Sequence, residues 1–381
     1  FIGPGTVTAC TLAGVDFGFN LLWAMLLSII ATFILQEMSA RLGIVTQKGL
    51  ADVIKQELHN PIIRNSVIAL IFSAIIIGNA SYEAGNIGGA TLGMEALFGT
   101  NYSSLYPFVL GGLAFVLLHL GSYKALEKVF IVLVLIMSLS FVMTAILTKP
   151  NMWELLKGLL VPSVPKNGIL TIIALVGTTV VPYNLFLHAA LVSEKWKSKD
   201  DLNLAKRDTM VSIILGGLVS ISIIISAAAI NSLEVNNVMG MAKALEPLYG
   251  SAALYFLGIG MFAAGITSSI TAPLAAAYVA NSCFGWNAGL KDFKFRMIWM
   301  VILFLGVFFL SFGIKPIEII KFAQITNGLL LPIIAVFLLW VVNRVGVMGK
   351  YKNTWSQNVF GLLIILLSVV LFLCLLFPLL F

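Results

Sequence analysis

Charged residues are scarce in this chain: they make up 10% of its 381 residues, whereas hydrophobic residues make up 60%. A soluble domain carries about 25% charged residues, so this composition excludes one. The apolar stretches are long and unbroken. A membrane-spanning helix needs about 20 apolar residues, whereas a barrel strand shows about ten residues of alternating polarity. The sequence therefore predicts an all-α integral membrane protein.

Cysteine and histidine are also rare, with three of each. Cys10, Cys283 and Cys374 lie in or beside apolar segments at unrelated spacings, which excludes a disulfide framework and a zinc motif. So few scattered nucleophiles and ligands argue against an enzyme, a resident metal and a cofactor. The net charge of +7 comes from short loops between apolar spans. A membrane surface explains such loops better than a nucleic acid does.

Eleven apolar spans are predicted, all in one transmembrane domain that covers residues 1–381. The first of them is short. The spans cover residues 6–15, 19–41, 62–94, 105–122, 125–148, 168–193, 208–230, 251–281, 295–312, 316–342 and 357–380. Residues 236–250 are predicted to form either a short amphipathic helix on the outer face or an ordinary loop.

Lysine and arginine are distributed unequally between alternate loops. Seventeen lie at the loops that follow the even-numbered spans, and five lie at the other loops. Because these residues accumulate on the cytoplasmic side, we expect a cytoplasmic N-terminus and an external C-terminus. The expected location is the plasma (inner) membrane, with membrane lipid around a multi-pass protein.

Two spans contain helix breakers. Gly3, Pro4 and Gly5 interrupt the first span, and Pro182 lies in the middle of the sixth. A proline inside a helix removes a backbone hydrogen bond, and within a bilayer such breaks persist where they are buried in protein or line a cavity. Pro182 alone would be read as a simple kink. Paired breaks five spans apart instead predict inverted repeats, residues 1–148 and 168–342, with an extra helix at 357–380, and they point to a transporter's binding site.

Four segments resemble the Nramp family of metal transporters. The segment "GPGTVTACTLAGVDFGFNLLW" is similar to the first-helix region, where the family usually has Asp-Pro-Gly-Asn, and "VVPYNLFLHAALV" is similar to the sixth helix, usually Met-Pro-His-Asn-Leu. "LQEMSARLGIVTQKGLADVI" and "FAQITNGLLLP" resemble segments of spans two and ten. The resemblance implies a LeuT-like fold with helices 1 and 6 broken, a midplane site and alternating access. It also implies a half-helix before the first break, helix 1a, which we expect to be absent from this chain.

The family's metal site, as the resemblance implies it, uses the Asp and Asn of the first break and the Met of the sixth helix. Gly3, Thr6 and Val181 occupy these positions here, Tyr183 replaces the first His of the sixth-helix motif, and His188 retains the second. Carboxylate and amide oxygens suit hard cations, and a thioether favours softer ones. None of the three ligands remains, so binding a dehydrated divalent cation is expected to be unfavourable.

The remaining groups favour an anion. The second half-helix begins near Thr6, and a helix N-terminus with unpaired N–H groups is an anion site. The candidate substrate-binding residues are Gly3, Pro4, Gly5, Thr6, Thr8, Thr178, Thr179, Val181, Tyr183 and Gln324. We expect a secondary active transporter for a small inorganic anion, with bicarbonate favoured because the sequence resembles an Nramp-related branch proposed to move it. The alternative is a divalent cation (Mn²⁺, Fe²⁺ or Mg²⁺), with proton coupling as an option.

Buried ionisable groups are functional hypotheses in a membrane protein. Glu83 and His188 are predicted to form a coupling or proton path, with H⁺ or Na⁺ as the coupling ion; the alternative is a buried pair that fixes two helices. Gln324 matches a glutamine that approaches the family's substrate on closure, and a structural hydrogen bond is its alternative. Ser268 and Ser269 are interpreted mainly as packing residues, with ion coupling as the other option.

Overall fold

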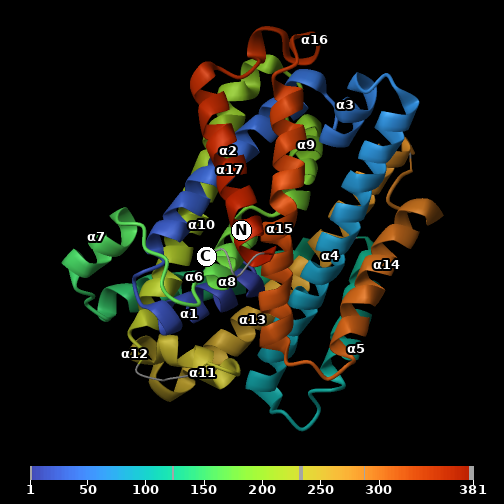
Figure 1. Ribbon diagram of the computed structural model, residues 1–381. Coiled ribbons are helices and arrows are strands. Elements are labelled where there is room, and N and C mark those ends of the chain that lie inside the picture. Colours follow the sequence, from blue (N-terminus) through green and yellow to red (C-terminus); the bar gives the residue numbers. More distant parts are fainter. Residues whose placement is uncertain (1, 122–123, 231–234, 287, 377–381) are drawn as a thin grey trace.

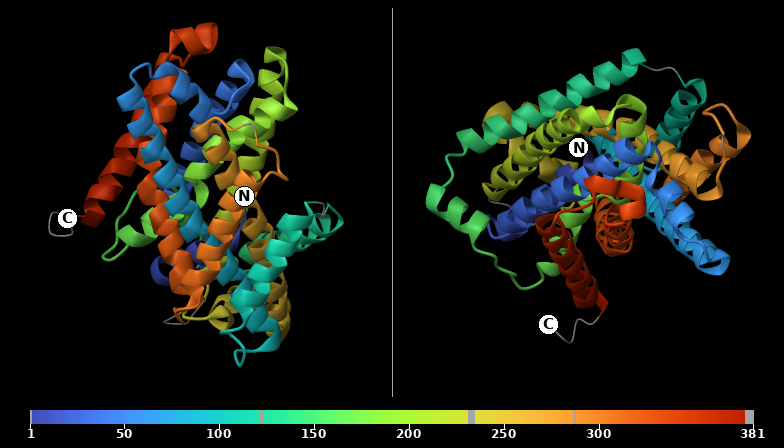
Figure 2. Two further views of the ribbon diagram at one scale, coloured as in Figure 1. Left: turned by 90° about the vertical axis from the view of Figure 1, so that its right-hand side faces the viewer. Right: turned by 90° about the horizontal axis from the view of Figure 1, so that it is seen from above.

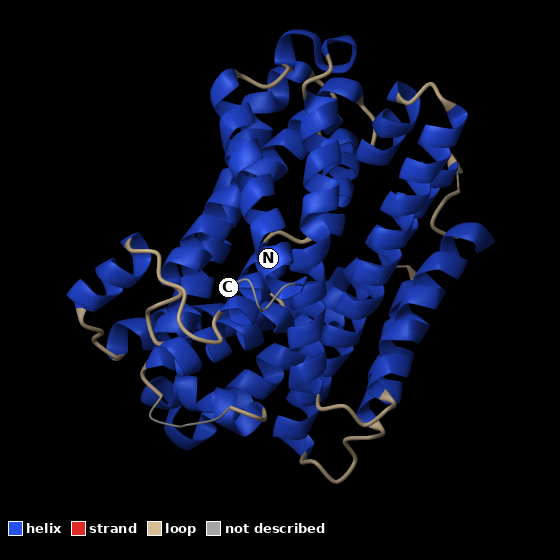
Figure 3. Cartoon of the chain, in the orientation of Figure 1, coloured by secondary structure: helices blue, strands red, loops and turns tan. Residues whose placement is uncertain are grey.

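The computed structural model describes residues 2–121, 124–230, 235–286 and 288–376. Within these ranges the chain forms helices and their connections, and no strand (Figure 3). This agrees with the all-α membrane protein predicted from composition. Short surface helices lie at both ends of the bundle, α3 (Leu50–Glu57) and α16 (Val345–Met348) at one end and α11 (Val238–Ala242) and α12 (Glu246–Tyr249) at the other (Figure 1).

The eleven predicted spans are all present. They are α1 (Pro4–Phe17), α2 (Leu22–Thr46), α4 (Pro61–Phe98), α5 (Tyr106–Leu120), α6 (Lys124–Leu147), the pair α8 (Ile169–Thr179) and α9 (Pro182–Lys195), α10 (Leu202–Ala228), α13 (Ala253–Phe284), α14 (Phe293–Leu310), α15 (Pro316–Val342) and α17 (Trp355–Leu376). Among the described residues, nine segments are long and apolar enough to cross a membrane, and α5 and α1 are shorter.

Several short helices in the connections were not predicted from the sequence. Besides α3, α11, α12 and α16, they are α7 (Met152–Leu160), η1 (Lys199–Asp201), η2 (Lys243–Leu245), η3 (Gly250–Ala252) and η4 (Gly349–Tyr351). The start of α7 has a recognisable signal, because the Asn151 side chain accepts hydrogen bonds from the N–H groups of Trp153 and Glu154. In residues 236–250 the structure has the short helices α11 and α12, so the helical alternative is the better description of that segment.

The helices α4 and α13 pack closely through small residues. A Cβ on Gly93 of α4 would lie 2.6 Å from the carbonyl oxygen of Gly258 and 2.6 Å from the nitrogen of Phe262, both in α13. A Cβ on Gly265 of α13 would lie 2.6 Å from the Cβ of Ala90. Such close approach of helix backbones is how small residues stabilise membrane bundles. The crossing fixes the part of α13 that reaches the helix breaks.

The break between α8 and α9 follows from the proline. Val180 and Val181 leave the helical conformation, and α9 begins at Pro182, which has no N–H group to lose. The first helix starts in the same way, with Gly3 in an extended conformation (φ −127°, ψ 177°) and Pro4 as its first residue. The two breaks lie side by side, because Thr6 Oγ1 of α1 and Thr178 Oγ1 of α8 are 3.0 Å apart in a hydrogen bond.

Candidate functional site at the helix breaks

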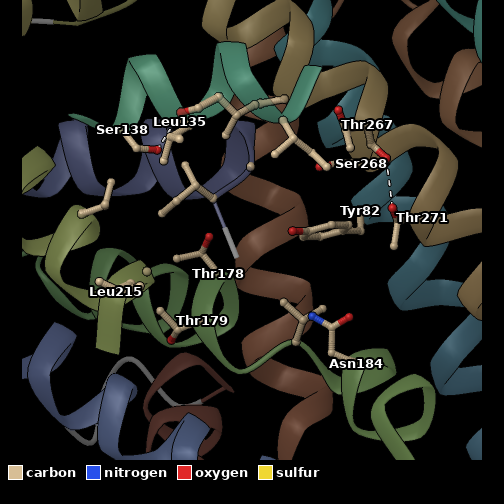
Figure 4. A pocket seen from close by; sticks show the side chains of 18 of the residues that line it. Tyr82, Leu135, Ser138, Thr178, Thr179, Asn184, Leu215, Thr267, Ser268 and Thr271 are labelled. Carbon is tan, nitrogen blue, oxygen red and sulfur yellow. Dashed lines mark hydrogen bonds between the residues drawn. The ribbon is translucent and has the colours of Figure 1, made fainter. Parts of the chain in front are cut away.

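A cavity of about 480 Å³ lies at the two breaks. Its lining comes from the starts of α1 and α9, the end of α8, and parts of α4, α6, α10 and α13 (Figure 4). Helices far apart in the sequence thus meet around one space in the middle of the bundle. This is the location that paired broken helices predict for a substrate site.

One side of the cavity is polar. The side chains of Tyr82, Thr178 and Ser268 project toward the same space from α4, α8 and α13 (Figure 4). The other polar lining residues are Ser138, Thr179, Tyr183, Asn184, Thr267 and Thr271. Hydroxyl groups both donate and accept hydrogen bonds, so this side can hold either an anion or the water shell of a cation.

An apolar part of the lining comes from α6 and α10. Ile131, Val134 and Leu135 contribute it from α6, and Leu215 and Val219 contribute it from α10. Ligand sites in proteins are commonly apolar with a few convergent polar groups.

The cavity has no formal charge on its described lining residues. Two helix N-termini face it, those of α1 and α9, and neither has a side-chain cap. The first N–H groups of a helix carry partial positive charge. Pro4 and Pro182 have no N–H, and the N–H of Asn184 donates to the carbonyl oxygen of Val181 at 3.0 Å, so these two ends offer fewer donors than the usual four. One helix C-terminus, that of α8, also reaches the cavity and opposes them. The balance is two positive ends against one negative end, with neutral side chains around them.

The predicted substrate-binding residues fall into two layers. Gly3, Thr178, Thr179, Val181 and Tyr183 line the cavity itself. The rings of Tyr183 and Tyr82 meet edge to face, with centroids 5.5 Å apart, so these two tyrosines close one side of the space.

The second layer lies directly behind the first. Thr6 supports Thr178 through their hydrogen bond. Pro4 packs where a Cβ on Gly89 would collide with it, and the amide of Gln324 lies where a Cβ on Gly5 would be. Gln324 is buried and holds the start of α1 from the α15 side.

Thr8 lies one turn further along α1 and is fully buried. It is not among the described residues that line the cavity. The geometry therefore gives Thr8 no direct contact with the cavity.

Glu83 and His188 occupy different surroundings. Glu83 is fully buried on α4, and its Oε2 accepts a hydrogen bond of 3.2 Å from Asn86. His188 on α9 contacts Thr209 of α10, with Nε2 3.2 Å from Oγ1. These hydrogen bonds, in the described part of the chain, do not join the two residues directly. Tyr82, which precedes Glu83, contacts Tyr183 and so links α4 to α9.

Five polar lining residues were not among the predicted site residues: Tyr82, Ser138, Asn184, Thr267 and Thr271. A signal existed for Tyr82, because it lies in the polar stretch "NASYEAGN" inside an apolar span. The sequence contains no comparable signal for Ser138 on α6 or for Thr267 and Thr271 on α13. Their approach to the breaks depends on packing between helices that the sequence does not specify.

Replacing Thr178 with valine is expected to reduce substrate flux about fivefold. Valine has nearly the same shape but removes the hydroxyl that pairs with Thr6 and faces the cavity, and a hydrogen bond contributes about 1 kcal/mol. The measurement is initial flux into proteoliposomes at matched protein content. Thr91→Val is the control, because Thr91 is buried and donates to Ile87 of its own helix. Equal flux in both variants would contradict a role for the Thr178 hydroxyl in the site.

A bundle of membrane-spanning helices with a polar cavity at paired helix breaks defines a membrane transporter of the LeuT-like type. Comparisons with known proteins agree. The family model described as "Natural resistance-associated macrophage protein-like" matches residues 1–378. The chain belongs to the Nramp family, and it is a transporter and not an enzyme.

Curated relatives include proteins named "Divalent metal cation transporter MntH". The one from Klebsiella pneumoniae is 28% identical, covering 97% of this chain and 89% of the relative. The one from Yersinia pestis is 29% identical, covering 97% and 90%. These names favour the cation alternative over the anion expectation.

Solved structures support the fold. A manganese transporter of Eremococcus coleocola has a TM-score of 0.79 at 20% identity, covering 97% of this chain and 82% of that chain. MHP1, a nucleobase-cation-symport-1 family transporter, has a TM-score of 0.57 at 15% identity, covering 97% and 92%. The predicted LeuT-like fold is confirmed.

Proposed function

We propose that this transporter carries a small anion, with bicarbonate as the first candidate, by alternating access through the cavity at the helix breaks. The observation that carries the proposal is the electrostatic character of the cavity. Two uncapped helix N-termini face a space without a charged side chain among its described lining residues. Backbone N–H groups at helix N-termini are well suited to small planar anions.

The residues at the family's metal-ligand positions support the same proposal. Gly3 has no side chain, Thr6 is engaged with Thr178, and Val181 is apolar and buried. The described residues that line the cavity include no Asp, Glu, His, Cys or Met. A divalent cation stripped of water would therefore meet only neutral oxygens, which do not offset its dehydration.

A divalent cation is the second candidate, and the names of the relatives favour it. A cation that keeps part of its water shell, such as Mg²⁺, would suit a cavity lined by hydroxyls. Glu83 would be the nearest buried carboxylate of α4, one residue from the lining residue Tyr82. The two candidates make opposite predictions for added negative charge at Gly3.

Three features complete the proposal. The chain is one transporter domain with inverted repeats at residues 1–148 and 168–342 and an extra helix at 357–380. It lies in the plasma (inner) membrane with its N-terminus in the cytoplasm, as the loop charges indicate. Glu83 and His188 serve ion coupling, by H⁺ or Na⁺, with Tyr82 and Tyr183 between their helices.

The proposal is tested by uptake into proteoliposomes at pH 8. Labelled bicarbonate is expected to accumulate above the level of protein-free liposomes, and excess formate or nitrate is expected to compete. Excess MnCl₂ or MgCl₂ at equal ionic strength is expected to leave uptake unchanged. Saturable manganese uptake without bicarbonate uptake would overturn the anion proposal and support the second candidate.

Replacing Glu83 with glutamine is expected to abolish uptake driven by an imposed pH gradient while exchange at equal pH continues. Glutamine keeps the shape and the Asn86 contact but carries no exchangeable charge. The measurement combines tracer uptake with an internal pH dye. Glu127→Gln, at an exposed residue, is the control. If gradient-driven uptake persists in the Glu83 variant, Glu83 is a structural residue and another group couples transport.

A further inference from the structure

A second cavity lies outside the transport site, in a groove between α15 and α17. Its volume is about 530 Å³. Val336, Leu339, Leu362 and Ile365 form its apolar walls. In both views of Figure 2, α17, coloured dark red, lies at the edge of the bundle. The groove therefore opens toward the surrounding membrane.

One end of the groove is polar and positively charged. Arg344 lies there, just beyond the end of α15, with its guanidinium 4.8 Å from the ring centroid of Trp340. Its side chain is half exposed, and Nε is 3.7 Å from Glu57 Oε2. That distance is long for an ion pair, so Glu57 does not satisfy the guanidinium, which has five N–H donors.

Two asparagines at the same end are already paired with each other. Asn343 Nδ2 donates to Asn358 Oδ1 at 2.7 Å, and Asn358 Nδ2 donates to Asn343 Oδ1 at 2.8 Å. This double hydrogen bond ties the end of α15 to the start of α17. It fixes the width of the groove and leaves Arg344 as the group available to an incoming ligand.

Basic residues dominate this end, although Glu57 of α3 lies against Arg344. The connection from α15 to α17 contains Arg344, Lys350 and Lys352, and the sequence has no Asp or Glu after Glu318. Trp340 at the end of α15 and the exposed Trp355 at the start of α17 mark this level as a membrane interface.

We propose that the groove binds an anionic phospholipid, with its phosphate at Arg344 and one acyl chain along the walls formed by α15 and α17. A guanidinium pairs with a phosphate through two parallel hydrogen bonds. Basic pockets between transmembrane helices at the membrane surface are suited to anionic head groups. The apolar walls continue the site into the bilayer, which a free phosphate would not use.

The test uses the whole purified chain in neutral detergent, with dioleoylphosphatidylglycerol, dioleoylphosphatidylcholine and glycerol phosphate as separate probes. Native mass spectrometry counts the retained lipid, and thermal unfolding follows stabilisation. The phosphatidylglycerol is expected to be retained and to raise the unfolding temperature, and the other two probes are not. Arg344→Gln is expected to weaken phosphatidylglycerol binding about fivefold, because one basic residue contributes about that factor.

Two further variants separate the parts of the site. Leu362→Trp, which fills the acyl groove without changing charge, is expected to weaken binding as well. Lys291→Gln removes the same charge from another loop and is expected to bind as the parent does. The proposal would be overturned if both lipids were retained equally or if glycerol phosphate alone were bound. It would also be overturned if Arg344→Gln changed the oligomeric state and did not lose lipid.

Discussion

Replacing Gly3 with aspartate is expected to reduce bicarbonate uptake at least about tenfold. The new carboxylate would lie at the start of α1, beside the cavity. Like charges about 4 Å apart repel by about 4 kcal/mol at an effective dielectric of about 20. Half of that penalty, about 2 kcal/mol, already weakens anion binding more than about tenfold.

The site has room for this side chain. Gly3 is extended, a conformation that any residue adopts, and a Cβ there would lie 3.3 Å from Ser268 Oγ and 3.8 Å from Tyr82 OH. Both neighbours are hydroxyl groups that can move slightly and donate to a carboxylate. The loss of flux is therefore expected from charge and not from misfolding.

Gly3→Asn is the matched control. Asparagine has the size of aspartate and caps a helix N-terminus equally well, so both variants stabilise α1 alike. Bicarbonate uptake is expected to stay within about threefold of the parent for Asn, a spread typical of one neutral contact. If Asp and Asn lower uptake equally, size is the cause and the electrostatic account of the cavity is wrong. If Asp creates manganese uptake, the family's cation site has been restored at this position.

Replacing Gly177 with alanine is expected to cost stability and nearly all transport. Gly177 lies on α8 directly before Thr178, and a Cβ there would collide with the backbone carbonyl of Gln324 in α15. A backbone group cannot rotate away as a side chain does, so the two helices must separate. Overpacking typically costs about 1–3 kcal/mol, and a backbone collision lies at the upper end. The separation would also displace Thr178 from Thr6.

Thermal unfolding in detergent and flux in proteoliposomes measure the two effects. Gly112→Ala is the control, since Gly112 lies in α5 with open space around its would-be Cβ, and alanine in a helix is favoured over glycine by about 1 kcal/mol. Gly112→Ala is expected to unfold at the parent temperature or slightly above. An unchanged unfolding temperature in Gly177→Ala would show that α8 and α15 are not in contact as described.

The fold was predictable because apolar spans and paired breakers are local signals. The position of Pro182 within a long apolar span predicted the α8–α9 break, and Gly3 and Pro4 predicted the start of α1. The short helix α7 was not predicted, although its N-cap residue Asn151 is visible in the sequence. A helix of nine residues is too short to form a long apolar segment, so hydropathy does not reveal it.

The site was only partly predictable. Residues next to the breaks, such as Thr178 and Tyr183, were found from the sequence, since a break exposes its own neighbours. Tyr82 and Thr271 reach the same cavity from α4 and α13, and their positions depend on the close glycine-mediated crossing of these two helices. The cargo is harder to predict than the site. Relatives with 28–29% identity are named for metal cations, whereas the described residues that line this cavity carry no charge.

Counterflow shows whether the cargo is a small anion. Proteoliposomes are preloaded with unlabelled bicarbonate and diluted into a trace of labelled bicarbonate, with protein-free liposomes in parallel to subtract permeation of CO₂. An anion transporter is expected to give a transient accumulation of label that disappears when the vesicles are preloaded with MnCl₂ instead. Transient accumulation of labelled manganese in MnCl₂-loaded vesicles, with none for bicarbonate, would contradict an anion cargo.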